Sequence, residues 1–294
     1  MSKLLKIPCS VGILTYNSGG SLEKTLRSVV NFAEIIVCDG GSIDDTLEMA
    51  RSSGCKIICQ DPKFKREDGR IKDFAGVRNQ MLEITTNKWF FYVDSDELLS
   101  DALVDEVRKT TACNKQPTAF WVPRKYVVNG LVIDCASTYP SRQMRLFHLD
   151  GVNRFIKSIH ERIEVKTDTP ISQLQNVMLI PMTTDVSAIR RKWNYYIDLE
   201  EQRVGDVTLW WWIKSCFQNL KISMLYLFRF LRNSLFCKGN KMPVRLEMER
   251  HRYHINLSTR FFWRIRPVER YVIIAFLIIV ATLTIFSFYY LATR

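Results

Sequence analysis

The sequence predicts an α/β protein: a mostly parallel sheet sandwiched by helices, followed by amphipathic helices and a C-terminal transmembrane helix. Three observations lead to this prediction. Short apolar runs alternate with amphipathic segments over the first hundred residues, the pattern becomes helical from about residue 187, and an uncharged run covers residues 271–292. The chain has 294 residues and is 47% hydrophobic, which is enough for a large core and too apolar for a disordered chain.

The first hundred residues contain four apolar runs of strand length. Because they are apolar throughout instead of alternating, both of their faces are expected to be buried, as in a parallel sheet. Between them, apolar residues recur every three or four positions, as Leu22, Leu26 and Val29 do, which indicates helices that cover the sheet. Strands are expected at 10–16, 34–39, 55–59 and 89–94, and helices at 19–32, 42–54 and 72–84.

Further elements are expected to complete this first domain, residues 1–185. Asn129-Gly130 is a strong turn signal and predicts an antiparallel hairpin across 118–134. A second hairpin is predicted across 142–156, with its turn at Asp150-Gly151. A helix is expected at 101–112 and a strand at 159–165.

Residues 186–267 are predicted to form a basic, amphipathic helical region that associates with a membrane. Helices are expected at 187–204 and 209–236. In the second helix, the basic side chains fall on one side of a helical wheel and nearly all others are apolar, which is typical of a helix in the membrane interface. The alternative is a helix that packs on the core of the first domain. The basic residues are Lys214, Lys221, Arg229 and Arg232.

Residues 268–294 are predicted to form a transmembrane anchor. The run 271–292 contains 22 residues and no charge, and about 20 apolar residues span a bilayer core. A buried core helix is the alternative. Arg266 and Arg270 lie on the N-terminal flank, which the positive-inside rule places in the cytoplasm. We therefore expect an inner (plasma) membrane protein with a cytoplasmic first domain.

The net charge of +12 is unevenly distributed along the chain. Residues 186–270 contain 17 Lys/Arg against 7 Asp/Glu, whereas the first 185 residues are nearly balanced at 24 against 23. A uniformly basic surface would suit nucleic acid. A basic block just before a long apolar run suits an anionic membrane surface better, so we predict a membrane partner and no nucleic acid.

Eight cysteines are scattered along the chain without a C-x-x-C pair. Several lie in apolar, strand-like runs. This pattern predicts reduced, buried thiols, and it argues against a disulfide framework or a zinc site.

A cluster of acids follows the fourth predicted strand. Asp94, Ser95 and Asp96 form a D-x-D, and Glu97 comes next. Ligands of parallel sheets bind beyond the carboxyl ends of the strands, where Asn17 and Asp39 also lie. Two carboxylates on one turn suit a hard cation such as Mg²⁺ or Mn²⁺, which commonly shares its site with substrate phosphates. The cation would neutralise a departing diphosphate as a Lewis acid.

Several segments in order resemble family 2 glycosyltransferases of the GT-A fold. The similar segments are "VGILTYN", "EIIVCDGGSIDDT", "GVRNQML" and "FFYVDSDE". The stretch from "FWVPRKYVVNG" to "SIHERIEV" resembles the bacterial lipopolysaccharide-core and O-antigen branch of that family. The resemblance is strongest over residues 9–100, and it implies a GT-A-like domain that binds a nucleotide-sugar donor.

The resemblance also implies roles for individual residues in nucleotide binding. Thr15 and Tyr16 would line the base pocket, with Asn17 beside them. Asp39 would accept a hydrogen bond from the base edge, which suits a carboxylate. Arg78 would contact the nucleotide side of the site, where a cation suits phosphate. Core packing of Tyr16 and a surface position for Arg78 are the alternatives.

The resemblance further implies residues that bind the metal and residues that contact the acceptor. Asp94 would bind ribose or metal-bound water, and Asp96 would bind the metal on the diphosphate. Arg142 and Arg145 are candidates for acceptor or diphosphate contacts.

A base must deprotonate the acceptor hydroxyl as it attacks the sugar, and one displacement inverts the anomeric centre. The His160-Glu161 pair supplies two candidates, which would point to opposite faces of a strand. We predict Glu161 as the base, with His160 second. The alternative is that the pair only closes an edge strand.

The sequence therefore predicts a metal-dependent, inverting glycosyltransferase. The acceptor would be a lipid-linked saccharide in lipopolysaccharide, O-antigen or capsule biosynthesis. A nucleotidyltransferase is one alternative, but it would need a basic, glycine-rich loop after the first strand, and "TYNSGGSLEKT" contains no such loop. A catalytically silent membrane scaffold is the other, and it would not bind a nucleotide sugar in a metal-dependent way.

Overall fold

A computed structural model describes residues 5–114, 116–271 and 274. The chain forms two compact units. One comprises the residues up to Asp134 together with Tyr139–Met182, and we call it the sheet unit. The other comprises Cys135–Thr138 together with the chain from Thr183 onward, and we call it the helical unit.

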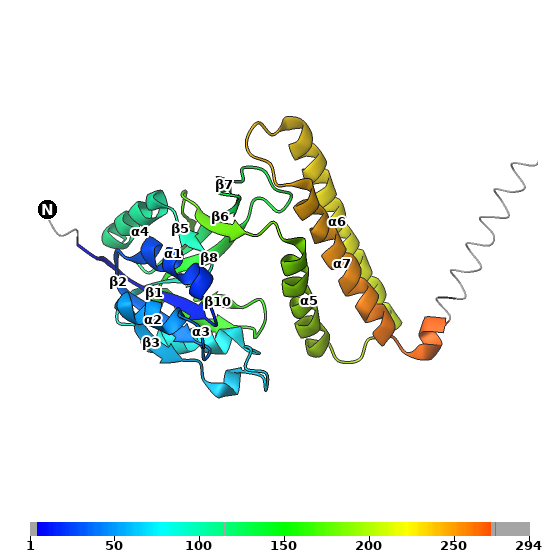
Figure 1. The fold of residues 1–294 in the computed structure, drawn as a ribbon, viewed down its shortest axis with the longest axis horizontal. Coiled ribbons are helices and arrows are strands. Elements are labelled where there is room, and N and C mark those ends of the chain that lie inside the picture. Colours follow the sequence, from blue (N-terminus) through cyan, green and yellow to red (C-terminus); the bar gives the residue numbers. More distant parts are fainter. Residues whose placement is uncertain (1–4, 115, 272–273, 275–294) are drawn as a thin grey trace, which may run out of the picture. The chain divides into compact units, whose positions relative to one another are not determined.

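A ten-stranded sheet forms the centre of the sheet unit, with the order β3-β2-β1-β4-β8-β6-β12-β5 and with β7 and β11 paired to β6 (Figure 1). The strands are β1 Ile7–Thr15, β2 Phe32–Asp39, β3 Lys56–Cys59, β4 Trp89–Asp94, β5 Leu98–Leu99, β6 Ala119–Val128, β7 Leu131–Val132, β8 Arg142–His148, β11 Ile171–Gln173 and β12 Met178–Met182. The first four strands are parallel, as predicted, but β8 runs antiparallel to β4 and β6. The sheet is therefore mixed.

Helices cover the parallel part of the sheet as the sequence predicts. The helices are α1 Gly19–Val29, α2 Thr46–Ser52, α3 Phe74–Glu83 and α4 Asp101–Cys113, with short 3₁₀ turns at Pro62–Phe64 and Leu149–Gly151. The chain runs from β1 outward to β3 and then returns to place β4 on the other side of β1. In open α/β sheets, ligands bind at such a reversal of strand order, which here lies between β1 and β4.

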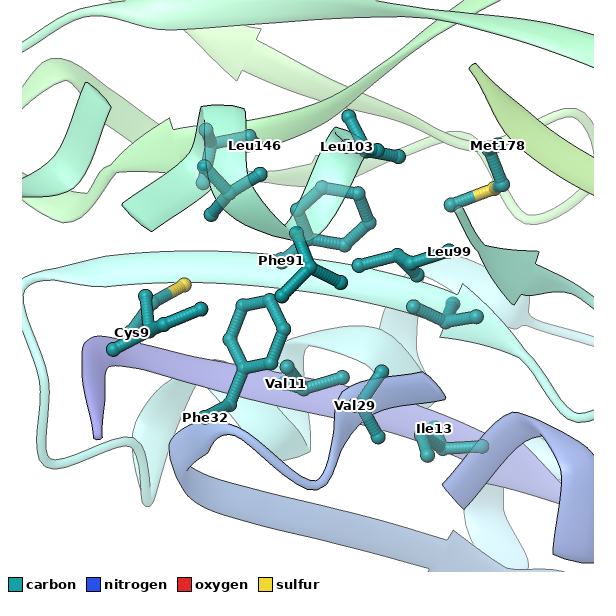
Figure 2. Close-up of a cluster of buried hydrophobic side chains, with 14 of the residues drawn as sticks. Cys9, Val11, Ile13, Val29, Phe32, Phe91, Leu99, Leu103, Leu146 and Met178 are labelled. Carbon is teal, nitrogen blue, oxygen red and sulfur yellow. The ribbon is translucent and has the colours of Figure 1, made fainter. Parts of the chain in front are cut away.

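Alternate side chains of β4 enter two separate hydrophobic clusters. Phe91 packs with Val11 and Ile13 of β1 and with Val29 and Leu103 from two covering helices (Figure 2). The neighbouring residue on β4, Phe90, packs on the other face, in the cluster that contains residues of α3. Burying one such aromatic side chain contributes roughly 1.5–3 kcal/mol. The strand that carries the D-x-D is thus fixed from both sides.

One predicted hairpin is confirmed and the other is wrong. β6 and β7 pair antiparallel around Asn129-Gly130, and both turn residues have positive φ. In contrast, β8 pairs with β4 and β6, so both of its edges are already occupied. β9 (Val152–Ile156) pairs instead with β10 (Arg162–Val165) in a separate two-stranded sheet. The predicted strand at 159–165 therefore begins only at Arg162.

The helical unit contains three long helices, α5 Val186–Arg203, α6 Leu209–Phe236 and α7 Val244–Arg264. α6 lies alongside α7, with the Trp211 ring 4.9 Å from Phe261 and the Trp212 ring 5.3 Å from Phe262 (Figure 1). None of the 28 residues of α6 is buried in the structure. Within the described part of the chain, no helix combines the length and apolar character that crossing a membrane requires. The predicted anchor, 268–294, lies outside the described residues except for 268–271 and 274.

The prediction of reduced, buried thiols is confirmed for some cysteines and wrong for others. Cys135 and Cys237 form a disulfide within the helical unit, although 102 residues separate them. One follows the β6–β7 hairpin and the other ends α6, so only the tertiary fold brings them together. Cys9 and Cys38 are buried thiols, but Cys59 and Cys113 are exposed.

Candidate functional site

The structure brings the predicted residues of the first strands together at the carboxyl ends of those strands. Thr15 and Asp39 are direct partners in the β1–β2 register, and Asp94 is the partner of Leu14. The loop after β1 also contacts the D-x-D turn, because the hydroxyls of Ser18 and Ser95 lie 2.9 Å apart. The carboxyl ends of β1, β2 and β4 therefore form one continuous site.

Asp39 is held by four donors from its own surroundings. Its Oδ1 accepts from the hydroxyls of Thr15 at 2.8 Å and Ser42 at 2.6 Å. Its Oδ2 accepts from the backbone N–H groups of Gly41 and Ser42, each at 2.8 Å. Burial favours a higher pKa for Asp39, but these hydrogen bonds outweigh it and lower the pKa. A nucleobase N–H would have to share or replace one of the two hydroxyl donors.

Tyr16 and Asn17 have different surroundings although they are adjacent. The Tyr16 side chain is 48% exposed and lies beside Gly40, where an added Cβ would come within 3.0 Å of its ring. Core packing of Tyr16 is thus excluded, and its ring offers a face for stacking. Asn17 has φ +47° and accepts from the Ile43 N–H at 2.9 Å, so it joins the loops after β1 and β2.

A buried cluster of alternating charges lies around Asp94. Arg78 of α3 donates from Nη2 to Asp94 Oδ1 at 2.8 Å and from Nε to Glu161 Oε1 at 2.7 Å. The surface position considered for Arg78 is therefore excluded, since the residue is only 3% exposed. Arg78 Nη1 is itself buried, and nothing accepts from it among the described residues. The arginine–carboxylate cluster comprises Arg78, Arg124, Arg145, Asp94, Glu97 and Glu161.

Arg145 and Glu97 form the innermost pair of this cluster. Arg145 Nη2 lies 3.0 Å from Glu97 Oε2 and 3.2 Å from Asp94 Oδ2. Glu97 also accepts from the Asp94 N–H at 3.2 Å, so it fixes the backbone of the D-x-D turn. Arg124 approaches Glu97 at 3.7 Å. The ring of Tyr92 lies 4.4 Å from the Arg78 guanidinium and 4.3 Å from that of Arg145.

The two acids respond to this environment in opposite directions. For Asp94, burial favours a higher pKa, but the guanidiniums of Arg145 and Arg78 outweigh it, and the pKa is lowered. For Glu97, burial is again the largest influence, and it raises the pKa despite the Arg145 charge. Asp94 therefore stays ionised at neutral pH, with both of its oxygens engaged by arginines.

The remaining predicted residues do not all reach this cluster. Glu161 does, but His160 is exposed, with φ +54°. Neither residue lies in a strand, so the argument that they point to opposite faces of a strand does not apply. Arg142, at the start of β8, is exposed and donates to Gln173 at 2.7 Å.

Sequence reasoning missed three polar residues of the site: Ser42, Glu97 and Arg124. Ser42 closes the "DGGS" turn, and its hydroxyl bonds Asp39. Glu97 was visible as a third acid directly after the D-x-D, but nothing in the local sequence showed that it is buried beside Arg145. Arg124 had no local signal, because β6 brings it to Glu97 from a distant part of the chain.

The described residues suit a cation that arrives with its substrate better than a resident metal ion. No group of three or more His, Cys, Asp or Glu side chains in the described part of the chain forms a metal-binding cluster. Asp94 is occupied by two arginines, whereas Asp96 is partly exposed on the turn. Mg²⁺ commonly uses one or two carboxylates together with substrate phosphates and water. Asp96 fits that arrangement, with Asp94 as a neighbouring charge.

The arrangement can bind a nucleotide diphosphate and stabilise negative charge. An aromatic face at Tyr16 and a fixed carboxylate at Asp39 lie on one side, and buried arginines lie on the other. Glu161 follows β9 along the chain and is one of the carboxylates of the cluster. If Glu161 took up a proton, its ion pair with Arg78 would break. The site therefore combines groups for binding, charge stabilisation and proton transfer.

Comparisons with known proteins find similarity to glycosyltransferases. Residues 10–151 match the family model described as "Glycosyl transferase family 2". The chain is 28% identical over 151 residues to the SPbeta prophage-derived glycosyltransferase SunS of Bacillus subtilis, covering 51% of this chain and 33% of that protein. It is 29% identical over 163 residues to the lipopolysaccharide core biosynthesis glycosyltransferase LpsC of Rhizobium meliloti, covering 54% and 57%.

The chain is also similar to two further proteins. An uncharacterized glycosyltransferase of Rickettsia bellii is 25% identical over 268 residues, covering 79% of this chain and 87% of that protein. A crystal structure of glucosyl-3-phosphoglycerate synthase from Mycobacterium tuberculosis with Mn²⁺ and UDP is 20% identical, with a TM-score of 0.32, covering 42% of this chain and 44% of that one. The chain thus spans about a third of SunS and just over half of LpsC.

Proposed function

Residues 10–151 belong to a glycosyl transferase family 2 domain, and from this premise we propose that the protein transfers a sugar from a nucleotide diphospho-sugar with inversion. The proposal rests on one observation: two groups of polar residues lie together at the carboxyl ends of β1, β2 and β4. The Thr15–Asp39 pair suits the base, and the arginine–carboxylate cluster around Asp94 suits the diphosphate. Both are held by hydrogen bonds and ion pairs before any substrate arrives, which lowers the cost of binding.

Each residue near the donor has a part in this proposal. Tyr16 stacks on the nucleobase, and Asp39 accepts from its edge. Arg78 supplies positive charge on the diphosphate side of the site, next to Asp94. Asp96 would hold a divalent cation, Mg²⁺ or Mn²⁺, on the diphosphate, and Asp94 beside it would bind ribose or metal-bound water. Such a cation would supply Lewis-acid stabilisation of the leaving group.

Glu161 is the proposed base of the reaction. Its carboxylate takes the proton of the acceptor hydroxyl while the oxygen attacks the sugar from the face opposite the diphosphate. The proton neutralises Glu161 and breaks its 2.7 Å ion pair with Arg78. Arg78, released from Glu161, then turns toward the departing diphosphate. Proton uptake by Glu161 thus assists both the attacking hydroxyl and the leaving group. His160 is the second candidate, and Arg145 acts by positioning Asp94 rather than by contacting the acceptor.

The proposed acceptor is a lipid-linked saccharide, as in lipopolysaccharide, O-antigen or capsule synthesis. The likeness to LpsC, named for lipopolysaccharide core biosynthesis, supports this choice. Exposed apolar side chains along α6, among them Trp210, Phe217 and Phe228, support a membrane location. The proposed location is the inner (plasma) membrane, with the sheet unit on the cytoplasmic side.

The test is a hydrolysis and binding screen of the purified full chain. Nucleotide sugars with different bases are supplied with and without Mn²⁺, and the released nucleotide is measured. We expect one donor to bind and hydrolyse slowly in a metal-dependent way. Asp96→Asn should lose that metal dependence, whereas Asp105→Asn, on the exposed side of α4, should retain it. If no donor binds in the presence of metal, the transferase proposal is wrong and a silent scaffold is favoured.

A further inference from the structure

A groove of about 690 Å³ runs between α6 and α7 within the helical unit. Its volume lies within the range of small-molecule sites, roughly 300–1,000 Å³. Its wall on α6 includes Trp212, Phe217 and Leu220, and its wall on α7 includes Ile255 and Phe262. Phe217, Leu220 and Ile255 are all more than half exposed, so the groove opens to the outside.

The polar groups at the base of the groove satisfy one another. Asn219 donates to the Ser258 hydroxyl at 2.9 Å, and its Oδ1 lies 3.1 Å from His254 Nδ1. The Trp212 indole N–H donates to the Ser258 carbonyl at 2.9 Å. Burial, followed by the charge of His251, lowers the pKa of His254, so this imidazole is neutral at pH 7. The groove therefore presents an apolar, uncharged lining that suits hydrocarbon better than a sugar or an ion.

Basic side chains of α6 and α7 lie beside the groove. α6 contains four Lys or Arg residues and no acid, and Lys221 directly follows the groove residue Leu220. On α7, Arg252 lies two turns before the groove residue Thr259, on the same side of the helix. The two acids of α7 are turned inward. Glu247 accepts from the Ser137 N–H at 2.8 Å, and Glu249 accepts from Arg190 Nε at 2.8 Å.

We propose that the α6–α7 groove binds a hydrocarbon chain of an anionic bilayer lipid, whose headgroup lies among the cations at the groove's edges. Apolar walls between two rows of positive charge match an acyl chain below an anionic headgroup. A face this apolar is unusual on a protein surface that meets only water. The proposal does not depend on glycosyl transfer, and it gives the helical unit a specific lipid site in addition to general interfacial contact.

Quenching of Trp212 fluorescence tests the proposal directly. The full chain is reconstituted in nanodiscs of phosphatidylglycerol whose acyl chains carry bromine, which quenches tryptophan on contact. The wild type is compared with Trp212→Phe, and the difference isolates the emission of Trp212 from that of the other six tryptophans. We expect this difference emission to be strongly quenched. Emission that brominated chains leave unchanged would overturn the proposal.

Two matched variants separate the groove from the rest of the interface. Leu220→Asp places a charge in the groove, and Leu235→Asp places the same charge on an exposed part of α6 outside it. We expect Leu220→Asp to abolish most of the Trp212 quenching and Leu235→Asp to preserve it, with both variants retaining wild-type helical circular dichroism. Equal loss in both variants would mean general interfacial contact only and would refute the groove site.

Lipid charge provides a further arm of the test. In nanodiscs of brominated phosphatidylcholine, the quenching should fall, because the zwitterionic headgroup does not pair with Lys221 and Arg252. Equal quenching in both lipids would refute the anionic part of the proposal. Nucleotide-sugar hydrolysis is measured on the same samples, so a failed lipid site and a failed transferase assignment give different results.

Discussion

Replacing Arg145 with methionine tests whether the arginine–carboxylate cluster holds the D-x-D strand in place. The Arg145 side chain is 2% exposed and contacts Glu97 at 3.0 Å and Asp94 at 3.2 Å. Arg145→Met keeps most of the side-chain volume but leaves Arg124, at 3.7 Å, as the one described cation paired with Glu97. Removing one partner of a buried ion pair costs about 3–5 kcal/mol, because the other charge remains buried.

The control lies on the same strand. Arg142→Met removes an exposed arginine of β8 that donates to Gln173, and exposed polar contacts of this kind contribute about 0–1 kcal/mol. For a unit of this size, 1 kcal/mol shifts the Tm by about 2–4 °C, so Arg145→Met should melt roughly 6–20 °C below the wild type. Differential scanning calorimetry of the full chain measures both variants. Equal melting temperatures for the two would refute the reasoning.

The pH dependence of this variant provides a second check. The folded protein raises the pKa of Glu97, so this residue destabilises the fold when ionised, and the penalty is relieved as the pH falls through that pKa. Arg145→Met removes the main opposing charge and raises the pKa further. The stability deficit of the variant should therefore narrow as the pH falls from neutral toward the usual range of carboxylates. A deficit that grows on acidification would contradict the assignment.

Three further outcomes are expected. Glu161→Gln should abolish transfer while donor binding is retained, because the amide cannot take a proton. The control Glu164→Gln, an exposed residue of β10, should leave turnover unchanged. A Glu161→Gln enzyme with the full rate would rule out Glu161 as the base. Gly76→Ala should cost about 1–3 kcal/mol, since its Cβ would lie 2.3 Å from the Phe64 ring, and an unchanged unfolding midpoint would argue against this packing. Thiol titration of denatured, non-reduced protein should find six free cysteines, and a count of eight would exclude the disulfide.

The disulfide also bears on the proposed location. Disulfides are rare in reducing compartments, and Cys135–Cys237 lies in the helical unit. Rapid alkylation in intact cells, followed by the same thiol count, reports whether the bond exists where the protein works. A persistent bond would contradict a cytoplasmic position for that pair of cysteines.

The sequence alone predicted the part of the fold that local patterns specify. Continuous apolar runs such as that of β4 indicate strands that are buried on both faces, as in a parallel sheet. The Asn129-Gly130 turn was predictable because few residue pairs accept positive φ at both positions. The order of these elements also predicted that Asp39 and Asp94 lie at the same end of the sheet, since the carboxyl ends of parallel strands lie together, and in the structure they end the two strands that flank β1.

Pairings between distant segments were decided by the tertiary structure. The Asp150-Gly151 turn does not form a hairpin because β4 and β6 occupy both edges of β8, and no local pattern reports that competition. Likewise, Arg124 reaches Glu97 only through the sheet. A buried charge is stable only beside its partner, and the partner's identity depends on which segments meet in space. Residue type and spacing thus determined the chemistry available at the sheet edge, and long-range packing determined which of those groups meet.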